Sequence, residues 1–385
     1  MSTRLALPLI MLVTAAAAAQ EPPPIEVVPP PAVPPQPPPQ PPPPPTPRWY
    51  DDIVLHGFVS FSITANFNDP PAAEGDSLGR NTYRAFDQFA NSYSLDVATL
   101  DLQRPVAKPG DVGGRIVVAA GQTIPRAEAA NGSGAGPFDL QQALISWITE
   151  IGNGLRLDVG KFVTPAGHEV IEGTDGYNDE YSHSFLFTFG PYTHLGLQLS
   201  YPFSSTVTAA LYATNGWDVL IDNNSKASLG AGLNLTPTDT FALQLLYLGG
   251  PELAGTDPPW RHFLDVIATV NASKAVKLAL HFDYAKEGDT SWYGAAGYAT
   301  IDASPSSLVG VRAEIFADPD GAKTGLATGQ TLTEITGTYT WKFGPHLVAR
   351  IELRWDHSSN DVYLKNDGTP TSSQLTLAAN YLGMF

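Results

Sequence analysis

The sequence predicts an all-β fold, a closed antiparallel transmembrane β-barrel of about sixteen strands with short periplasmic turns and long extracellular loops. Three observations predict it. Apolar and polar residues alternate with a period of two along most of the chain, the connections between these segments are short and long in turn, and the last segment ends on an aromatic residue, Phe385. A period of two places alternate side chains on opposite faces of a strand, so each segment has one apolar and one polar face.

Residues 1–19 are expected to be a secretory signal peptide. Arg4 precedes an apolar run from Leu5 to Val13, and small residues then lead to Ala19. This order predicts export and cleavage after Ala19. The apolar run is too short for a transmembrane helix, which needs about 20 residues. We therefore expect an exported chain without a helical membrane anchor.

Residues 20–48 are expected to be a proline-rich periplasmic spacer. Of the 35 prolines in the chain, 17 fall between Glu21 and Pro47. Proline has no backbone N–H and fixes φ, so we expect an extended polyproline helix, which at about 3.1 Å per residue would reach roughly 80 Å. The spacer is either a passive linker or a segment that contacts the cell wall.

Residues 49–385 are expected to form the barrel. The period of two is clear where Leu278, Leu280 and Phe282 alternate with His281 and Asp283. Strands of this type are predicted near residues 54–67, 91–105, 112–123, 138–149, 154–163, 185–201, 206–215, 226–236, 240–249, 261–271, 274–284, 292–302, 306–317, 330–343, 346–356 and 373–385. Because the count is even, both ends of the barrel are expected on the periplasmic side.

The connections between the predicted strands are sorted by length. Tight turns rich in Pro, Gly, Asn, Asp and Ser are predicted at residues 108–111, 150–153, 202–205, 237–239, 272–273, 303–305 and 344–345. Long loops are predicted at residues 68–90, 124–137, 164–184, 250–260, 318–329 and 357–372. A soluble β-sandwich has no need of this sorting, whereas an outer-membrane barrel has short turns at one end and long loops at the other. In contact with outer-membrane lipid the sheet must also close, because lipid cannot satisfy a free edge.

The final strand carries the expected signal for assembly. Tyr381 and Phe385 lie four residues apart on its apolar face. The arrangement resembles the carboxy-terminal signal of bacterial outer-membrane barrels, although Gly383 is smaller than the residue usually found there. We expect the outer-membrane barrel assembly machinery to bind this strand. The alternative is an ordinary edge strand that ends on phenylalanine.

Composition excludes several classes of function. The chain has no cysteine, which excludes disulfides and metal sites built on cysteine. Its formal charge of −17 argues against a nucleic-acid partner, because phosphate binding needs concentrated Lys and Arg. No set of Ser, His and Asp indicates a catalytic triad. We expect no catalytic residue and no cofactor.

Two short motifs resemble metal sites but are expected to be structural. His168 to Glu172 resembles the HExxH helix of metalloproteases with Glu in place of the second His, and Gly167 and Gly173 flank it, which disfavours a helix. Asp318 to Gly321 has the residue types of a calcium loop without its spaced carboxylates and terminal Glu. We expect no metal at either motif.

Several stretches of the chain together resemble the family of OmpL-like outer-membrane β-barrel porins. They are HGFVSFSITANFN (56–68), RAFDQFANSYSLDVATLDLQRP (84–105), GKFVTPAGHEV (160–170), HSFLFTFGPYTHLGLQLSYPFSSTVTAALYATNGWD (183–218), VGVRAEIFADPDG (309–321) and ARIELRWDHSS (349–359), followed by the final strand. They cover most of residues 55–385. The resemblance implies the barrel fold, the outer membrane and a diffusion channel, and it leaves the solute undefined.

Charged residues on two predicted strands are candidates for the lumen wall. They share the polar face of their strands, and they are Arg312 and Glu314 on the thirteenth strand and Arg350, Glu352, Arg354 and Asp356 on the fifteenth. A barrel of about sixteen strands leaves an aqueous channel, and charges facing away from lipid would line it. The alternative is a ladder of salt bridges that braces the wall.

The third long loop is the candidate pore constriction. It contains five acidic residues, Glu169, Glu172, Asp175, Asp179 and Glu180, and no Lys or Arg occurs between Lys161 and Lys226. We expect the loop to fold into the barrel, where an acidic loop opposite Arg312 would order polar solutes and filter ions. The alternative is a solvated acidic lid outside the barrel.

The function predicted from these features is that of an outer-membrane porin, a water-filled channel for passive diffusion of small hydrophilic solutes or ions, and not an enzyme. Two alternatives are an outer-membrane barrel enzyme that acts as a surface hydrolase and a structural barrel that ties the membrane to the cell wall. The solute, the ion selectivity and the oligomeric state, including a possible homo-oligomer, are left open by the sequence.

Overall fold

A computed structural model describes residues 48, 50–72, 78–124 and 136–385. The predicted signal peptide and nearly all of the predicted spacer lie outside the described residues. Residues 49–385 form one compact unit. No helix in the described part of the chain is long and apolar enough to cross a membrane.

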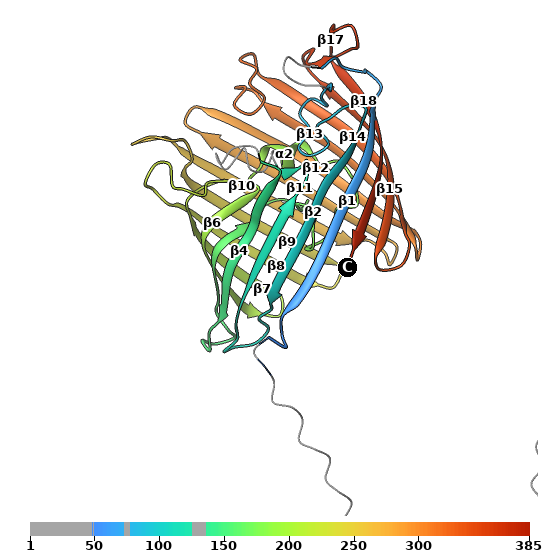
Figure 1. The fold of residues 1–385 in the computed structure, drawn as a ribbon. Coiled ribbons are helices and arrows are strands. Elements are labelled where there is room, and N and C mark those ends of the chain that lie inside the picture. The colour runs from blue at the N-terminus through green and yellow to red at the C-terminus, as the bar shows by residue number, and fades with distance from the viewer. Residues whose placement is uncertain (1–47, 49, 73–77, 125–135) are drawn as a thin grey trace, which may run out of the picture. The chain divides into compact units, whose positions relative to one another are not determined.

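Sixteen antiparallel strands form a closed barrel, which confirms the predicted fold class (Figure 1). The barrel strands are β1 (Val54–Asn66), β2 (Ser92–Arg104), β3 (Val112–Ala120), β4 (Phe138–Ile148), β5 (Arg156–Val163), β6 (Thr193–Ser204), β7 (Val207–Thr214), β8 (Ser228–Thr238), β9 (Phe241–Pro251), β10 (Trp260–Asn271), β11 (Val276–Glu287), β12 (Thr290–Ser304), β13 (Ser307–Asp318), β14 (Gln330–Lys342), β15 (Leu347–Ser358) and β18 (Ser373–Met384). Each pairs with its neighbours in the chain, and a hairpin of β16 (Tyr363–Leu364) and β17 (Pro370–Thr371) lies in the last long loop.

The connections keep the predicted sorting by length with one exception. β11 and β12 extend beyond their predicted ends and meet in a two-residue turn at the end of the barrel that carries the long loops. We call this end the long-loop end and the opposite end the short-turn end. β1 begins and β18 finishes at the short-turn end.

The two faces of each strand differ as the period of two predicts. On β11 the side chains of Leu278, Leu280 and Phe282 are exposed on the outside of the barrel, whereas His281 and Asp283 are buried inside it. Lipid favours the first set, and polar groups find partners only within the second. The sequence pattern therefore decides which face of the sheet becomes the lumen.

β1 and β18 close the ring, and their ladder ends at Gly57 and Phe385. The Gly57 N–H donates to the Phe385 carbonyl at 2.6 Å, and the Phe385 N–H donates back to the Gly57 carbonyl at 3.0 Å. A Cβ on Gly57 would lie 2.2 Å from the Phe385 ring, so a larger residue at position 57 would force this exposed ring to move. Tyr381 packs nearby, opposite Phe61 in the β1–β18 register.

The prediction of a strand over 185–201 is wrong in its first part. Residues Phe185–Phe189 form a short helix, α2, and β6 begins at Thr193. Ser184 caps the helix by accepting a hydrogen bond from the Phe187 N–H at 3.0 Å. All five residues of the helix are buried inside the barrel. Their backbone N–H groups bond to Ser184 and to Glu314 of β13 rather than to a neighbouring strand.

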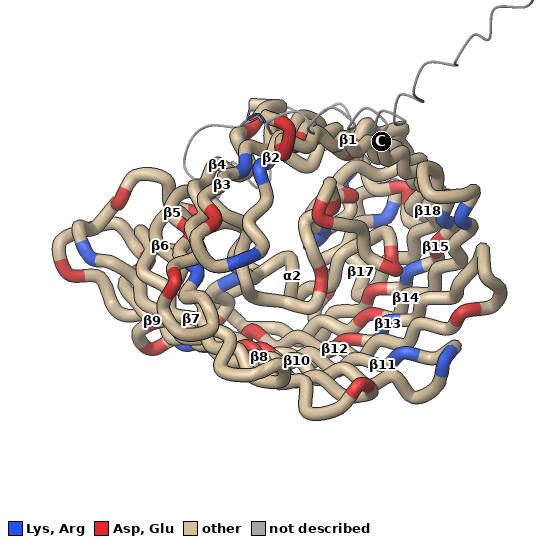
Figure 2. The backbone as a smooth tube through the Cα atoms, turned by 90° about the horizontal axis from the view of Figure 1, so that it is seen from below, with Lys and Arg blue, Asp and Glu red and all other residues tan. Residues whose placement is uncertain are grey.

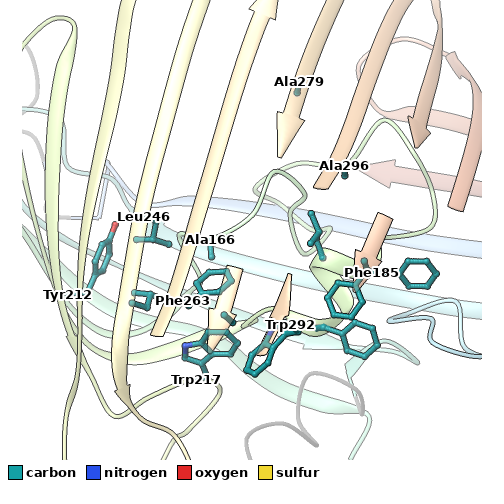
Figure 3. Packing of buried hydrophobic residues seen from close by; sticks show 14 of the residues in the cluster. Ala166, Phe185, Tyr212, Trp217, Leu246, Phe263, Ala279, Trp292 and Ala296 are labelled. Atoms are coloured by element: carbon teal, nitrogen blue, oxygen red, sulfur yellow. The ribbon is translucent and has the colours of Figure 1, made fainter. Parts of the chain in front are cut away.

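Part of the interior beside α2 is packed with apolar and aromatic side chains (Figure 3). Phe189 of the helix stacks on Phe316 of β13 with ring centroids 4.8 Å apart. Trp217 meets Phe263 of β10 edge to face at 5.0 Å. This cluster fills one side of the long-loop half of the barrel and leaves the polar side chains on the other strands to form the site.

Candidate functional site

Residues 164–192, here called the inner loop, run from β5 to β6 through the inside of the barrel. Figure 2 shows this loop and α2 within the ring of strands. Its Gly167 N–H donates to Asp265 of β10 at 2.9 Å, and its Thr174 hydroxyl donates to Asp101 of β2 at 2.9 Å. The loop is therefore bonded to wall strands in two separate parts of the ring.

Arginines of the wall bind the acidic residues of the inner loop. Arg312 places Nη1 2.5 Å from Oε1 of Glu169 and 2.7 Å from the Ser182 carbonyl. Arg350 holds both carboxylate oxygens of Glu172, at 2.8 and 3.0 Å. Charge-assisted hydrogen bonds of this kind are the strong class in proteins. They fix the loop against β13 and β15.

Acidic residues of the wall bind the backbone of the same loop. Glu314 accepts hydrogen bonds from the N–H groups of Phe185 and Leu186, both at 2.7 Å. Glu352 accepts one from the Tyr181 N–H at 2.6 Å. A helix start leaves free N–H groups, and a carboxylate satisfies them. The acidic residues predicted for the wall thus dock the loop.

The remaining wall candidates form a chain of buried ion pairs. Arg354 donates from Nε to Asp356 at 2.7 Å and from Nη1 to the His183 carbonyl of the inner loop. Asp356 also accepts hydrogen bonds from Arg84 at 2.8 and 3.0 Å. Arg312, Arg350 and Arg354 are almost entirely buried. The arginine wall therefore lies beneath the inner loop and not across open water from it.

The five acidic residues of the inner loop fall into two groups. Glu169, Glu172 and Glu180 are buried. Asp175 pairs with Arg115 of β3 at 2.6 Å and stays partly exposed, and Asp179 accepts a hydrogen bond from Thr300 of β12 at 2.5 Å. Asp179 borders a cavity of about 700 Å³ and Asp175 one of about 310 Å³. Of the first group, Glu172 borders only a small cavity of about 20 Å³, so among the described residues the second group borders the larger spaces.

Arg84 is a functional residue that sequence reasoning missed. It comes from the first long loop, is 4 % exposed, and joins Asp356 and Asp87 inside the barrel. Arg84 is the first residue of the stretch 84–105, which carries part of the family resemblance, and this position could have indicated its importance. A second loop therefore enters the barrel beside the inner loop.

Two acidic or histidine-bearing motifs are tied into the fold. His168 packs its ring 4.4 Å from that of Tyr298, and the next residue, Glu169, is bound to Arg312. The Asp318 carboxylate accepts three backbone hydrogen bonds from residues 322–324. Within the described residues, neither motif brings three histidine or carboxylate ligand atoms together, and the expectation of no metal stays a prediction.

A third grouping was not foreseen. Asp265, His281 and Asp283 bring one ligand atom each within 4.8 Å of one another on β10 and β11. His281 Nε2 lies 2.9 Å from Asp265 and 3.1 Å from Asp283, so the imidazole already bridges the two carboxylates. The Gly167 N–H adds a further hydrogen bond to Asp265. The grouping helps to seat the inner loop on the wall.

Residues 75–79 read Gly-Asp-Ser-Leu-Gly, which has the spacing of a nucleophile elbow. An elbow needs a strand before the serine and a helix after it. Ser77 lies outside the described residues. The prediction that the chain has no catalytic residue therefore stays a prediction.

Comparisons with known proteins agree with this architecture. A family model described as "Putative beta-barrel porin-2, OmpL-like" matches residues 52–385. No curated protein matches the chain. Similar solved structures include an anion-selective porin from Comamonas acidovorans, which is 12 % identical with a TM-score of 0.57 over 86 % of this chain and 99 % of that one. Another is Pseudomonas putida OprB, 11 % identical with a TM-score of 0.57 over 87 % and 94 %.

OmpF from Salmonella typhi, in complex with daunomycin, is a further similar structure, 12 % identical with a TM-score of 0.56 over 86 % of this chain and 99 % of that one. At these identities the likeness shows the fold alone. The family match is broader, since it runs from the start of the barrel to its last residue. The chain therefore belongs to the family of OmpL-like β-barrel porins and is an outer-membrane channel.

Proposed function

We propose that this channel admits small hydrophilic solutes or ions by passive diffusion, and that the inner loop forms its constriction. The observation that supports the proposal is the bonding of the loop to separate parts of the wall, with cavities of about 310 and 700 Å³ beside it. A segment fixed across a pore reduces its cross-section, and the charges at the narrowing select what passes.

We infer different roles for the acidic residues of the loop. Glu169, Glu172 and Glu180 hold the loop in place through burial and contact with the arginine wall. Asp175 and Asp179, which border open space, meet the solute. Two aspartates facing the pore favour cations over anions at the narrowing. Arg115, paired with Asp175, moderates this preference, as do the lysines that line the cavity beside Asp179, which are Lys274, Lys277 and Lys342.

The proposed setting follows the sorting of the loops. Residues 1–19 act as a signal peptide cleaved after Ala19, residues 20–48 lie in the periplasm, and the long loops face outward. The barrel assembly machinery binds the final strand through Tyr381 and Phe385. The spacer is either a passive linker or a segment that contacts the cell wall. OmpT of Vibrio cholerae, a protein of similar fold, is described in a trimer form. This supports a homo-oligomer as one assembly of the present chain.

Recordings in a planar lipid bilayer test the channel. We expect stepwise increases in conductance from purified, folded protein, because each inserted barrel adds one water-filled path. The heat-dependent mobility of a folded barrel on a gel is the control for folding. A folded sample that gives no steps would contradict the proposal.

Two rivals predict that failure. For a surface hydrolase, Ser77 is the residue to replace with alanine, and hydrolysis of an ester substrate that disappears in this variant would favour the enzyme. For a structural tether, deletion of residues 20–48 would release the membrane from the cell wall, and the folded barrel would give no conductance steps with or without these residues.

A further inference from the structure

A second polar pocket opens at the long-loop end of the barrel, away from the acidic side of the inner loop. Its volume is about 450 Å³, and its lining includes Phe189, Tyr192, Trp217, Arg261 and Lys323. We call it the outer pocket. Its residues come from the inner loop, from the loops after β7 and β13, and from the start of β10. A solute that enters from the long-loop end meets this pocket before the constriction.

Two cations of the outer pocket share two indole rings. The Lys323 ammonium lies 4.4 Å from the ring centre of Trp292 and 5.3 Å from that of Trp217. The Arg261 guanidinium lies 4.7 Å from the Trp217 ring and 5.6 Å from the Trp292 ring. Figure 3 shows the two tryptophans next to one another at the edge of the apolar cluster. The rings stabilise each cation separately, but the cations repel one another.

The two cations of the pocket differ in their ion pairing, and the carboxylates of Asp218 and Glu252 line the same space. Lys323 forms no ion pair with another residue of the described ranges. Arg261 pairs with Glu287 at 2.9 Å, yet its Nε is buried without a hydrogen-bond partner. Arg261 and Lys323 nevertheless line the same space, so one bound anion can contact both side chains.

The acidic residues of the pocket are engaged elsewhere. Asp218 accepts hydrogen bonds from the N–H groups of Tyr192 and Thr193 at 2.8 and 2.7 Å. Glu252 accepts one from the Trp217 N–H at 2.6 Å and one from the Ser228 hydroxyl at 2.7 Å. Their oxygens hold the loop backbone, so they do not contact the Lys323 ammonium.

The loops are built to hold this arrangement without a ligand. The Asp318 carboxylate, fully buried, accepts the N–H of Lys323 at 2.9 Å and that of Thr324 at 2.8 Å. Gly216, at φ +133°, precedes Trp217, and a Cβ there would lie 2.6 Å from the Glu252 carboxylate. Preorganised groups lose little freedom when a ligand binds, which raises affinity.

We propose that the outer pocket binds the carboxylate of a small organic acid with an apolar, preferably aromatic, body. Arg261 offers a planar donor group that matches a carboxylate, and Lys323 adds a point charge beside it. The side chains of Phe189, Tyr192 and Val219 border the same space and suit an apolar body better than a strongly hydrated inorganic anion. The inference rests on the proposed channel function, for which it names a class of solute.

Calorimetry on the full chain folded in detergent tests the pocket, with benzoate as the probe and benzamide as its neutral counterpart. We expect saturable binding of benzoate and none of benzamide. Lys323→Gln should weaken benzoate binding by about tenfold or more, the effect of losing one charge-assisted contact, whereas Lys323→Arg should retain it.

Lys226→Gln is the matched control. It removes the same charge from another loop at the same end of the barrel, where Lys226 pairs with Asp257 at 2.8 Å. Benzoate affinity should stay within about twofold of the unmodified chain, since a charge outside the pocket acts only through screened solvent. Equal loss in both glutamine variants, equal binding of inorganic phosphate, or no saturable benzoate binding would each overturn the proposal.

The two proposals fail in different ways. Stepwise conductance without benzoate binding would leave the channel and remove the pocket. Benzoate binding that follows the expected variants, in a folded sample without conductance, would support the pocket and contradict the channel. The folded mobility of each variant on a gel confirms that loss of binding is not loss of the barrel.

Discussion

Arg312 on β13 and Glu169 on the inner loop form a buried ion pair of 2.5 Å, although 143 positions separate them in the chain. Arg312 also donates to Glu334 on the neighbouring strand at 2.6 Å. One guanidinium thus joins the loop to two strands. Breaking a buried pair by removing one partner is expensive, because the other charge stays in a dry site.

Replacing Arg312 with Gln should therefore destabilise the barrel by about 3 to 5 kcal/mol, because Glu169 loses its ion-pair partner and Glu334 keeps only the longer contact with Arg354 at 3.6 Å. The measurement is the temperature at which the folded gel band is lost. The double variant Arg312→Gln, Glu169→Gln should recover part of this loss. If the single variant melts like the unmodified protein, the pair does not hold the loop.

Deletion of residues 167–182 should raise conductance and weaken cation preference. The deletion removes Asp175 and Asp179 and uncovers Arg312, Arg350 and Arg354, whose positive charge would then face the lumen. Single-channel conductance and the reversal potential across a salt gradient measure the two effects. Unchanged values for both quantities would show that the inner loop does not form the constriction.

Deletion of Phe385 should leave more unfolded precursor in the periplasm, because it removes the proposed assembly signal and the two backbone bonds to Gly57 that end the β1–β18 ladder. Gly57→Val should act in the same direction through its clash with the Phe385 ring. The control is Gly337→Ala on β14, where an added Cβ meets nothing within 4 Å. Membrane yield of folded protein is the measurement, and normal yield of both test variants would contradict the assembly role.

Benzoate binding at the outer pocket should strengthen as pH falls from about 8 to 6. Burial, and then the neighbouring Arg261, lower the pKa of Lys323 to about 7, so this side chain gains its charge as pH falls. Burial raises the pKa of Asp218 to about 7, so this carboxylate loses its charge over the same range. Both changes favour an anion.

The other charged groups that face Lys323 are Arg261, Glu252, Glu287 and Asp318. Calorimetry at three pH values measures the effect on benzoate. In Lys323→Gln the dependence should shrink to the part contributed by Asp218. An affinity that does not change with pH in the unmodified chain would contradict the assignment.

An epitope tag placed in the loop 357–372 should be detected on intact cells, whereas a tag at residues 237–239 should not. The first site lies at the long-loop end and the second at the short-turn end. Antibody labelling before and after permeabilisation provides the measurement. The reverse result would invert the proposed orientation.

Most of the barrel could be predicted from the sequence because lipid outside and polar partners inside impose a strict period of two. The exception is α2, where Phe185, Leu186, Phe187 and Phe189 leave no polar face. A segment that is apolar on both faces fits a buried strand or a buried helix equally well. The helix is favoured by its surroundings inside the barrel, where Glu314 accepts hydrogen bonds from the first N–H groups of α2.

The candidate site was less accessible to sequence reasoning. The alternation of polar and apolar residues along β13 and β15 indicated that Arg312 and Arg350 point inward. It could not show how deep into the barrel a loop from the opposite side would reach. The outer pocket was harder still, because Arg261 and Lys323 belong to separate strands and loops. Each looks like an ordinary surface cation until the fold places them on the same two indole rings.

The pairing of β1 with β18, which ends at Gly57 and Phe385, also constrains the order in which parts of the protein can fold. The ring cannot shut until β18, the last strand, pairs with β1, yet once shut it encloses ion pairs that join the inner loop to β13 and β15. A closed cylinder offers no room to thread 29 residues inward and bury their charges afterwards. We therefore expect the inner loop to take its place first and the last strands of the barrel to pair around it.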